Sequence, residues 1–222
     1  MSAGNKILQQ LSRALPVPGA GLAQSDPQDT WVRLWLMALE DTDIQLDTAQ
    51  ITDLWHRLPY WAFAWAGGRA LAGYLMRNPH WVAGQRVLDF GCGSGIVGIT
   101  AALCGASEVW VADLDDNALL AVQENARLNQ VRVNIVENQN WPEADRLLAA
   151  DVLYDISASS DLQQLLLQVP QWLLAETRQV APDFVDLQHL QHGVFATLPA
   201  IGDFDEAVAV EIYCRRDESP LG

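Results

Sequence analysis

The sequence predicts an α/β fold: a doubly wound, mostly parallel sheet with helices on both faces and an antiparallel pair of C-terminal strands. Three observations lead to this prediction. From residue 86 onward, apolar segments alternate with helical patterns, and such alternation is typical of parallel strands joined by crossover helices. Three glycines on alternate positions follow the first of these strands. The last two apolar segments are joined by a loop containing Gly-Asp, which favours antiparallel pairing.

The chain is long enough for one globular unit with a sizeable core. It has 222 residues, of which half are apolar and nine are tryptophan, so disorder is not expected. We divide it into an N-terminal helical extension, residues 1–58, that packs on the core and a single globular domain, residues 59–222. In the extension, we predict helices over 5–15 and 48–58, a loop over 16–29, and an apolar segment over 30–41 whose periodicity does not separate helix from strand.

The globular domain begins with a helix over 67–79, which ends at Asn78-Pro79. Strands are predicted over 86–90, 108–114, 132–138 and 146–154, with helices over 95–106 and 116–130 between them. The apolar run 162–175 is interpreted as a helix broken at Pro170, which leaves room only for a shortened fifth strand before Pro182. Residues 193–199 and 206–216 are predicted to form the terminal antiparallel pair.

Charge and cysteine content exclude several classes of partner. The formal net charge is −15, which argues against binding to phosphate backbones and therefore to nucleic acid. Three widely spaced cysteines fit neither a disulfide framework nor a paired metal site, and His189 and His192 have no third ligand nearby in sequence, so no metal is expected. Reduced thiols are typical of a cytoplasmic setting, and no export signal or membrane-spanning run is recognisable. We therefore expect a cytoplasmic protein that does not enter a membrane, and we also expect a monomer.

The glycine-rich turn predicts a cofactor site. Ligands of open parallel sheets bind at the carboxyl ends of the strands, where Gly91, Gly93 and Gly95 would lie beside Asp113 at the end of the next strand. Small residues let a ligand approach the backbone, and a strand-terminal carboxylate accepts hydrogen bonds from ribose hydroxyls. With Gly98, the turn also satisfies the dinucleotide pattern G-x-G-x-x-G, so a nicotinamide cofactor is one alternative.

Two features favour a cationic cofactor instead. Asp89 brings a second carboxylate to the turn, which is unfavourable beside a pyrophosphate and favourable beside a cation. The chain also lacks a Tyr-x-x-x-Lys pair, because its single lysine is Lys6. S-adenosylmethionine carries adenosine, ribose and a cationic aminoacyl sulfonium, and it fits both carboxylates. The competing interpretation of Asp89 is a buried, hydrogen-bonded strand residue without a role in binding.

Four segments carry a resemblance to a known family: LPYWAFAWAGGRALAGYL (58–75), VLDFGCGSGIVGI (87–99), GASEVWVADLDDNAL (105–119) and ADVLYD (150–155). The D-x-G-x-G-x-G string resembles the signature of class I, seven-stranded S-adenosylmethionine-dependent methyltransferases. Together the segments resemble the group that includes the electron-transfer-flavoprotein β-subunit lysine methyltransferase and its bacterial relatives. The resemblance covers roughly residues 30–160 and implies a Rossmann-like, seven-stranded methyltransferase domain that methylates lysine in a protein substrate.

The resemblance also implies roles for individual residues. The cofactor would contact Trp65, Asp89, Gly91, Gly93, Gly95, Asp113, Trp141 and Ala150. The acceptor amine would be oriented by Asp151, Tyr154 and Asp155. Purely structural interpretations compete with some of these roles: Trp65 could pack in the core, Asp151 could cap a helix, and Tyr154 could serve packing alone.

Two other functions stay open at this stage. The shortened fifth strand is compatible with a methyltransferase-like module that binds cofactor without turnover. A small-molecule methyltransferase would need a closed acceptor pocket in place of an open, acidic rim.

Overall fold

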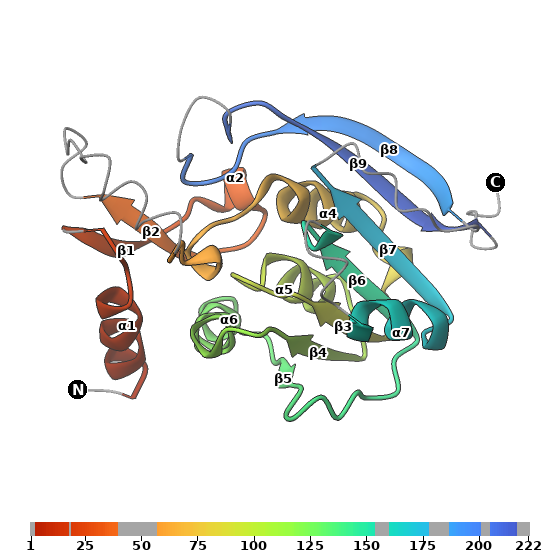
Figure 1. Ribbon diagram of the computed structural model, residues 1–222, viewed down its shortest axis with the longest axis horizontal. Helices are drawn as coiled ribbons and strands as arrows, with labels where there is room; N and C mark the ends of the chain where they lie inside the picture. The colour runs from red at the N-terminus through yellow and green to blue at the C-terminus, as the bar shows by residue number, and fades with distance from the viewer. Residues whose placement is uncertain are drawn as a thin grey trace.

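The computed structural model describes residues 3–17, 19–39, 57–153, 160–177, 187–200 and 205–216. They form a seven-stranded sheet with helices around it, as Figure 1 shows. The strand order is β5-β4-β3-β6-β7-β9-β8. All neighbouring pairs are parallel except those of β9, which runs antiparallel to β7 and β8. The strands are β3 (Arg86–Phe90), β4 (Glu108–Ala112), β5 (Asn134–Ile135), β6 (Arg146–Ala150), β7 (Gln171–Glu176), β8 (Leu187–Phe195) and β9 (Val208–Arg215).

Helices cover both faces of the sheet, as the doubly wound prediction requires (Figure 1). The helices α4 (Ala66–Arg77), α5 (Ile96–Leu103) and α6 (Asp116–Leu128) pack on one face, and α7 (Ser160–Gln168) packs on the other. Side chains alternate between the faces along each strand: Leu148 of β6 joins the first core cluster, whereas Leu147 joins the second. The fold class predicted from the sequence is therefore confirmed.

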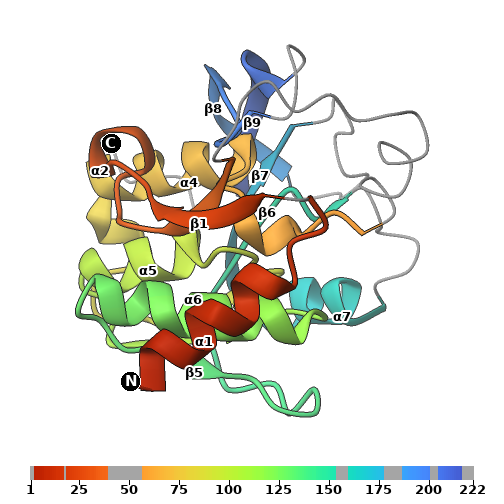
Figure 2. The same ribbon diagram turned by 90° about the vertical axis from the view of Figure 1, so that its left-hand side faces the viewer.

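The N-terminal segment lies against α6 (Figure 2). It contains the helices α1 (Ala3–Arg13) and α2 (Pro27–Thr30), and a two-stranded antiparallel sheet of β1 (Ala20–Gln24) and β2 (Trp35–Leu39). The predicted loop over 16–29 is therefore wrong for residues 20–24, and the ambiguous segment 30–41 contains a strand. The β1 residues Ala-Gly-Leu-Ala-Gln have weak strand propensity, so their strand depends on pairing with β2.

The largest correction concerns residues 162–175, interpreted from the sequence as one interrupted helix. Here α7 ends at Gln168 and β7 begins at Gln171, on either side of Pro170. The strand is a continuous apolar run, Trp172 to Ala175, buried on both faces, and such runs are typical of parallel strands inside a sheet. The fifth strand is present at six residues, so the predicted shortening is wrong. The predicted helix over 48–58 falls almost entirely outside the described residues.

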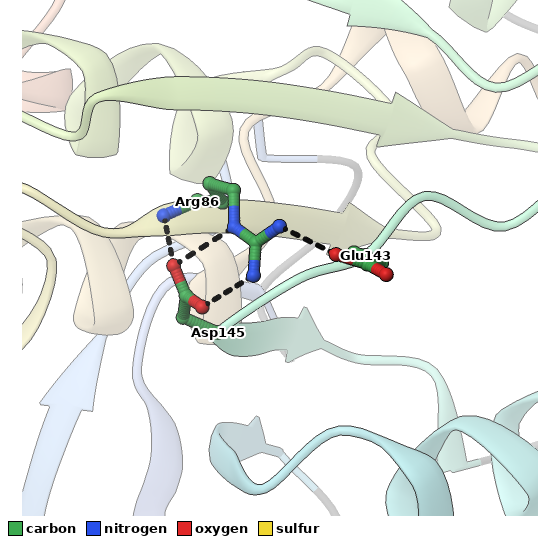
Figure 3. Close-up of polar contacts among 3 residues, drawn as sticks. All are labelled: Arg86, Glu143 and Asp145. Atoms are coloured by element: carbon green, nitrogen blue, oxygen red, sulfur yellow. Dashed lines mark hydrogen bonds and ion pairs between the residues drawn. The ribbon is translucent and has the colours of Figure 1, made fainter.

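The amino ends of the central strands are held together by a network of charged groups (Figure 3). Arg86 at the start of β3 donates from Nη2 to Oδ1 of Asp145 at 2.8 Å and from Nη1 to Oε2 of Glu143 at 3.0 Å. Oδ2 of Asp145 also accepts the backbone N–H of Arg86 at 2.8 Å. The loop before β6 is thereby fastened to the start of β3, at the sheet edge opposite the glycine turn.

No helix in the described part of the chain is both long enough and apolar enough to span a bilayer.

Candidate functional site

The glycine turn lies between β3 and α5, at the carboxyl edge of the sheet. Gly91, Gly93 and Gly95 have φ values of 68°, 50° and 80°, which glycine adopts without steric cost. A Cβ atom at Gly91 would lie 2.7 Å from Val152 Cγ1, and one at Gly95 would collide with Val122. At Gly93 the nearest atom to such a Cβ would be the carbonyl oxygen of Tyr60, at 3.9 Å. Gly93 is therefore where the turn faces open space.

Asp113 follows β4 and closes the turn from the neighbouring strand. Its Oδ2 accepts the N–H of Gly93 at 2.8 Å, and its Oδ1 accepts the N–H of Asp115 at 3.0 Å. Burial raises the pKa of this carboxyl, and the backbone N–H groups of Asp115, Gly93 and Leu114 partly offset the rise. The carboxylate oxygens sit beside the open face of Gly93, and together they can accept more than these three hydrogen bonds.

Asp89 is a buried strand residue in this structure, only 2% exposed. Its Oδ2 accepts the N–H of Gly98 in α5 at 2.8 Å. Burial raises the pKa of the carboxyl to about 7, and the negative charge of Asp113 adds to the rise. Asp89 is therefore a buried, hydrogen-bonded strand residue, and it lies two positions before Gly91, close enough for its charge to act on Asp113.

Asp151 follows Ala150 at the end of β6 and faces the first turn of α4. Its Oδ2 accepts the N–H of Gly67 at 2.8 Å, and a Cβ atom at that glycine would lie 2.6 Å from both carboxylate oxygens. Asp151 has a φ of 55°, a left-handed conformation that aspartate tolerates better than most residues. Burial raises its pKa to about 6, against opposing contacts with Thr177 and the backbone of Gly67 and Gly68.

Two aromatic groups flank the turn. Trp65, the N-cap of α4, donates from Nε1 to the carbonyl of Tyr60 at 2.9 Å, and the two ring centroids are 5.5 Å apart. Trp141 is partly buried, with its ring centroid 5.8 Å from that of Phe90, the last residue of β3. Both predicted aromatic residues therefore lie at the carboxyl edge of the sheet, although each also packs against protein.

The structure brings most of the predicted site residues together. The turn glycines, Asp89, Asp113, Ala150 and Asp151 all lie at the carboxyl ends of β3, β4 and β6. Tyr154 and Asp155 lie outside the described residues. His189 and His192, which sequence spacing left without a third partner, both hydrogen-bond to Glu211 on the outer hairpin. No group of His, Cys, Asp or Glu in the described ranges is arranged to hold a metal ion.

Sequence reasoning missed three residues near the site. Leu114, next to Asp113, is 98% exposed and offers an apolar side chain to a ligand at this edge. The sequence pattern that could have identified it is an apolar residue directly after a strand-terminal carboxylate. Glu176 at the end of β7 is buried and accepts the N–H groups of Val152 and Leu153, both at 3.2 Å. Asn125 is fully buried on α6, and its signal was a polar residue among the core-facing positions of that helix.

The electrostatics of this edge are one-sided. Asp89, Asp113 and Asp151 are hydrogen-bonded by backbone N–H groups, and no basic side chain among the described residues bonds to any of the three. Buried or half-buried carboxylates without a cation are costly. Such a site would favour a cationic ligand and repel a pyrophosphate.

Comparison with known proteins finds similarity to methyltransferases. A family model described as ribosomal protein L11 methyltransferase matches residues 78–169. The electron transfer flavoprotein beta subunit lysine methyltransferase of Danio rerio is 42% identical over 116 residues, which is 49% of this chain and 44% of that protein. The ribosomal protein L11 methyltransferase of Dichelobacter nodosus is 31% identical over 164 residues, 67% of this chain and 54% of that protein. The chain thus spans about half the length of these curated relatives.

Solved structures show the same fold at low sequence identity. The magnesium protoporphyrin IX methyltransferase of Synechocystis, solved with bound SAM, has a TM-score of 0.50 and 16% identity, covering 78% of this chain and 86% of its own. A dimethyladenosine transferase from Plasmodium falciparum has a TM-score of 0.51 and 14% identity, covering 68% and 62%. The chain therefore has the class I, seven-stranded methyltransferase fold and resembles the electron-transfer-flavoprotein β-subunit lysine methyltransferase group.

Proposed function

We propose that this protein is an S-adenosylmethionine-dependent methyltransferase that acts on lysine in a protein substrate. The observation that carries the proposal is the pairing of Asp113 with the open face of Gly93, at a sheet edge where three carboxyls have no basic partner among the described residues. The curated relatives are named as protein methyltransferases, which supports both the reaction and the class of substrate.

The residues at this edge fit the cofactor. The Asp113 oxygens would accept the ribose hydroxyls, Gly93 would let the ligand approach the backbone, and Leu114 and Trp141 would provide apolar surface for the adenine. Trp65 and Ala150 would flank the cofactor, and Asp89 would favour its positive charge from beneath the turn. The cofactor would supply a methyl group activated by its sulfonium charge, and the protein would align donor and acceptor and exclude water.

The acceptor side is proposed to lie at the ends of β6 and β7. A lysine amine must be neutral to attack carbon, so a group that takes or relays its proton is required. Asp151 is held there by the α4 backbone, and a pKa of about 6 leaves it mostly ionised at neutral pH. Tyr154 and Asp155 follow it in sequence and are proposed to complete the acceptor pocket. Glu176, which accepts the N–H groups of Val152 and Leu153, would keep the backbone that follows Asp151 in place.

Two earlier alternatives lose their support. A pyrophosphate would face the unpaired carboxyls, which disfavours a nicotinamide cofactor. The module without turnover was suggested by a shortened fifth strand, and β7 is six residues long. A small-molecule acceptor is distinguished by the experiment below.

We further propose that residues 1–58 are an accessory extension on a methyltransferase domain of residues 59–222, and that the protein is a cytoplasmic monomer with no nucleic-acid or membrane partner. Three free cysteine thiols support a reducing compartment. The charge of −15 supports the exclusion of nucleic acid and favours a basic acceptor segment.

The test is calorimetric titration with S-adenosylmethionine and with NADH, on the natural chain, on Asp113→Ala and on Glu108→Ala. Glu108 is a matched control because it lies at the amino end of the same strand, β4. Hydrogen bonds to a charged acceptor contribute about 1.5–3 kcal/mol each, so losing two should weaken S-adenosylmethionine binding by about 100-fold or more. Glu108→Ala should leave the Kd unchanged.

Transfer is measured with methyl-labelled cofactor and two purified acceptors, the electron transfer flavoprotein β subunit and ribosomal protein L11, followed by amino-acid analysis for methyl-lysine. Methyl-lysine in either acceptor supports the proposal. Binding of NADH alone would contradict it. Cofactor binding with no transfer to protein would reject the lysine acceptor and favour a small-molecule substrate or a binding module.

A further inference from the structure

The asparagine Asn125 connects two parts of the molecule that are far apart in sequence. Its side chain is fully buried on α6. Nδ2 donates to the carbonyl of Ser94, inside the glycine turn, at 2.8 Å, and Oδ1 accepts the backbone N–H of Trp35, in β2, at 2.7 Å. One amide therefore spans the N-terminal segment and the proposed cofactor turn.

Two residues of α6, Val122 and Asn125, contact the glycine turn. Val122, one turn before Asn125, packs against the place where a side chain at Gly95 would be, and residues three apart lie on the same face of a helix. The N–H of Gly95 donates to the carbonyl of Cys92 at 2.7 Å. Because the Ser94 carbonyl and the Gly95 N–H belong to one peptide group, Asn125 and Cys92 together set the orientation of that plane.

A second asparagine provides an internal comparison. Asn129, one turn further along α6, accepts the N–H of Arg33 at 2.9 Å and donates to the Arg33 carbonyl at 2.6 Å. It also donates to the carbonyl of Asn125 at 2.8 Å. Both asparagines thus fasten the segment that enters β2, but only Asn125 also reaches the glycine turn.

We propose that Asn125 is a positioning residue for the cofactor site, which holds the glycine turn in its binding geometry and couples the turn to the docked N-terminal segment. The inference rests on the proposed function. A purely structural residue would fasten β2 to α6 and affect stability alone, as Asn129 should. The coupling predicts reciprocity: ligand binding at the turn strengthens docking of β2, because linkage acts equally in both directions.

The experiment compares Asn125→Asp with Asn129→Asp in the full chain. Each replaces an amide donor by a carboxylate of the same size, so Asn125→Asp loses its donor to Ser94 and places negative charge beside that carbonyl. We expect S-adenosylmethionine binding to weaken at least tenfold in Asn125→Asp and to stay within about twofold in Asn129→Asp, with both variants less resistant to urea. Equal affinities in Asn125→Asp and the natural chain would overturn the proposal.

Amide hydrogen exchange gives a readout that does not depend on that variant folding well. In the natural chain, saturating S-adenosylmethionine should slow exchange of the Trp35 N–H, and no change at Trp35 would overturn the coupling. In the unliganded proteins, Asn125→Asp should speed exchange at Gly93 and Gly95 and Asn129→Asp should not. If the natural chain binds no S-adenosylmethionine, the proposed function fails, and the unliganded exchange rates alone decide whether Asn125 holds the turn.

Discussion

The two ends of the parallel strands differ sharply in how their charges are balanced. At the amino end, Arg86 is paired with two carboxylates (Figure 3). Arg146, only 3% exposed, donates to Gln85 at 3.0 Å and to Gln171 at 2.5 Å, and lies 4.9 Å from the ring centroid of Trp81. At the carboxyl end, the buried carboxyl of Asp89 accepts the backbone N–H of Gly98, and no basic side chain in the described part of the chain bonds to it.

This difference indicates that the two edges have different roles. Charges that are paired within the protein contribute to holding strands together. Carboxyls that are buried without a cation reduce stability, and such groups are concentrated at functional sites. The amino edge therefore serves the fold, and the carboxyl edge suits the cationic cofactor of the proposed function. Four substitutions test this contrast.

The largest effect is expected from Asp89→Asn. In the folded protein, the pKa of Asp89 is raised from 3.8 to about 7, so the folded state binds a proton that the unfolded chain has released. Stability therefore falls as the pH rises between about 4 and 7. A pKa rise of that size corresponds to a loss of roughly 4 kcal/mol in the free energy of unfolding above pH 7. Asparagine carries no charge and can still accept the Gly98 N–H, so it should remove this cost.

Urea denaturation of Asp89→Asn at pH 5 and pH 8 checks the sign. The variant should gain stability over the natural chain as the pH rises, and its affinity for S-adenosylmethionine should fall at pH 8, where the ionised carboxyl would favour the sulfonium. A variant less stable than the natural chain at pH 8 would show that the ionised carboxyl of Asp89 does not destabilise the folded protein.

The opposite sign is expected at the other edge. Arg146→Met should lower the free energy of unfolding by about 2 kcal/mol or more, because amide oxygens that lose their donors cost about 1–3 kcal/mol each. The measurement is urea denaturation with a parallel calorimetric titration. S-adenosylmethionine affinity should be unchanged, and a loss of affinity in the folded variant would mean that the two edges are coupled.

A smaller effect, about tenfold in transfer rate, is expected from Gly67→Ala. The added Cβ atom would lie 2.6 Å from both oxygens of Asp151 and would displace that carboxyl from the proposed acceptor site. The kcat for methyl transfer should fall while the Kd for S-adenosylmethionine stays within about twofold. Gly21→Ala is the matched control, because its Cβ would meet no atom within 4 Å. An unchanged kcat would remove Asp151 from the acceptor site.

The smallest effect is expected from Glu143→Gln, at the paired edge. The Glu143 side chain is 90% exposed, and exposed ion pairs contribute little; Arg86 also keeps Asp145. The urea midpoint and the cofactor Kd should both be unchanged within error. A clear loss of stability would show that the outer part of the Arg86 network matters more than its exposure suggests.

Local patterns in the sequence were sufficient to predict the glycine turn. The strand at 86–90 is confirmed residue for residue, and the glycines after it have the positive φ values for which glycine is suited. Asp113 could be placed beside the turn because parallel strands share one carboxyl edge. These features depend on a few neighbouring residues and on one rule of topology, so the sequence alone determined them.

Other features were decided only by tertiary structure. The run 162–175 has no periodicity that separates buried strand from buried helix, and its division into α7 and β7 depends on the neighbouring strands. β1 is a strand because β2 pairs with it. The contacts of Asn125 with Ser94 and Trp35 join residues 31 and 90 positions away. Hydrogen bonds over such distances leave no local pattern in a sequence, and here they hold the turn that the sequence predicted.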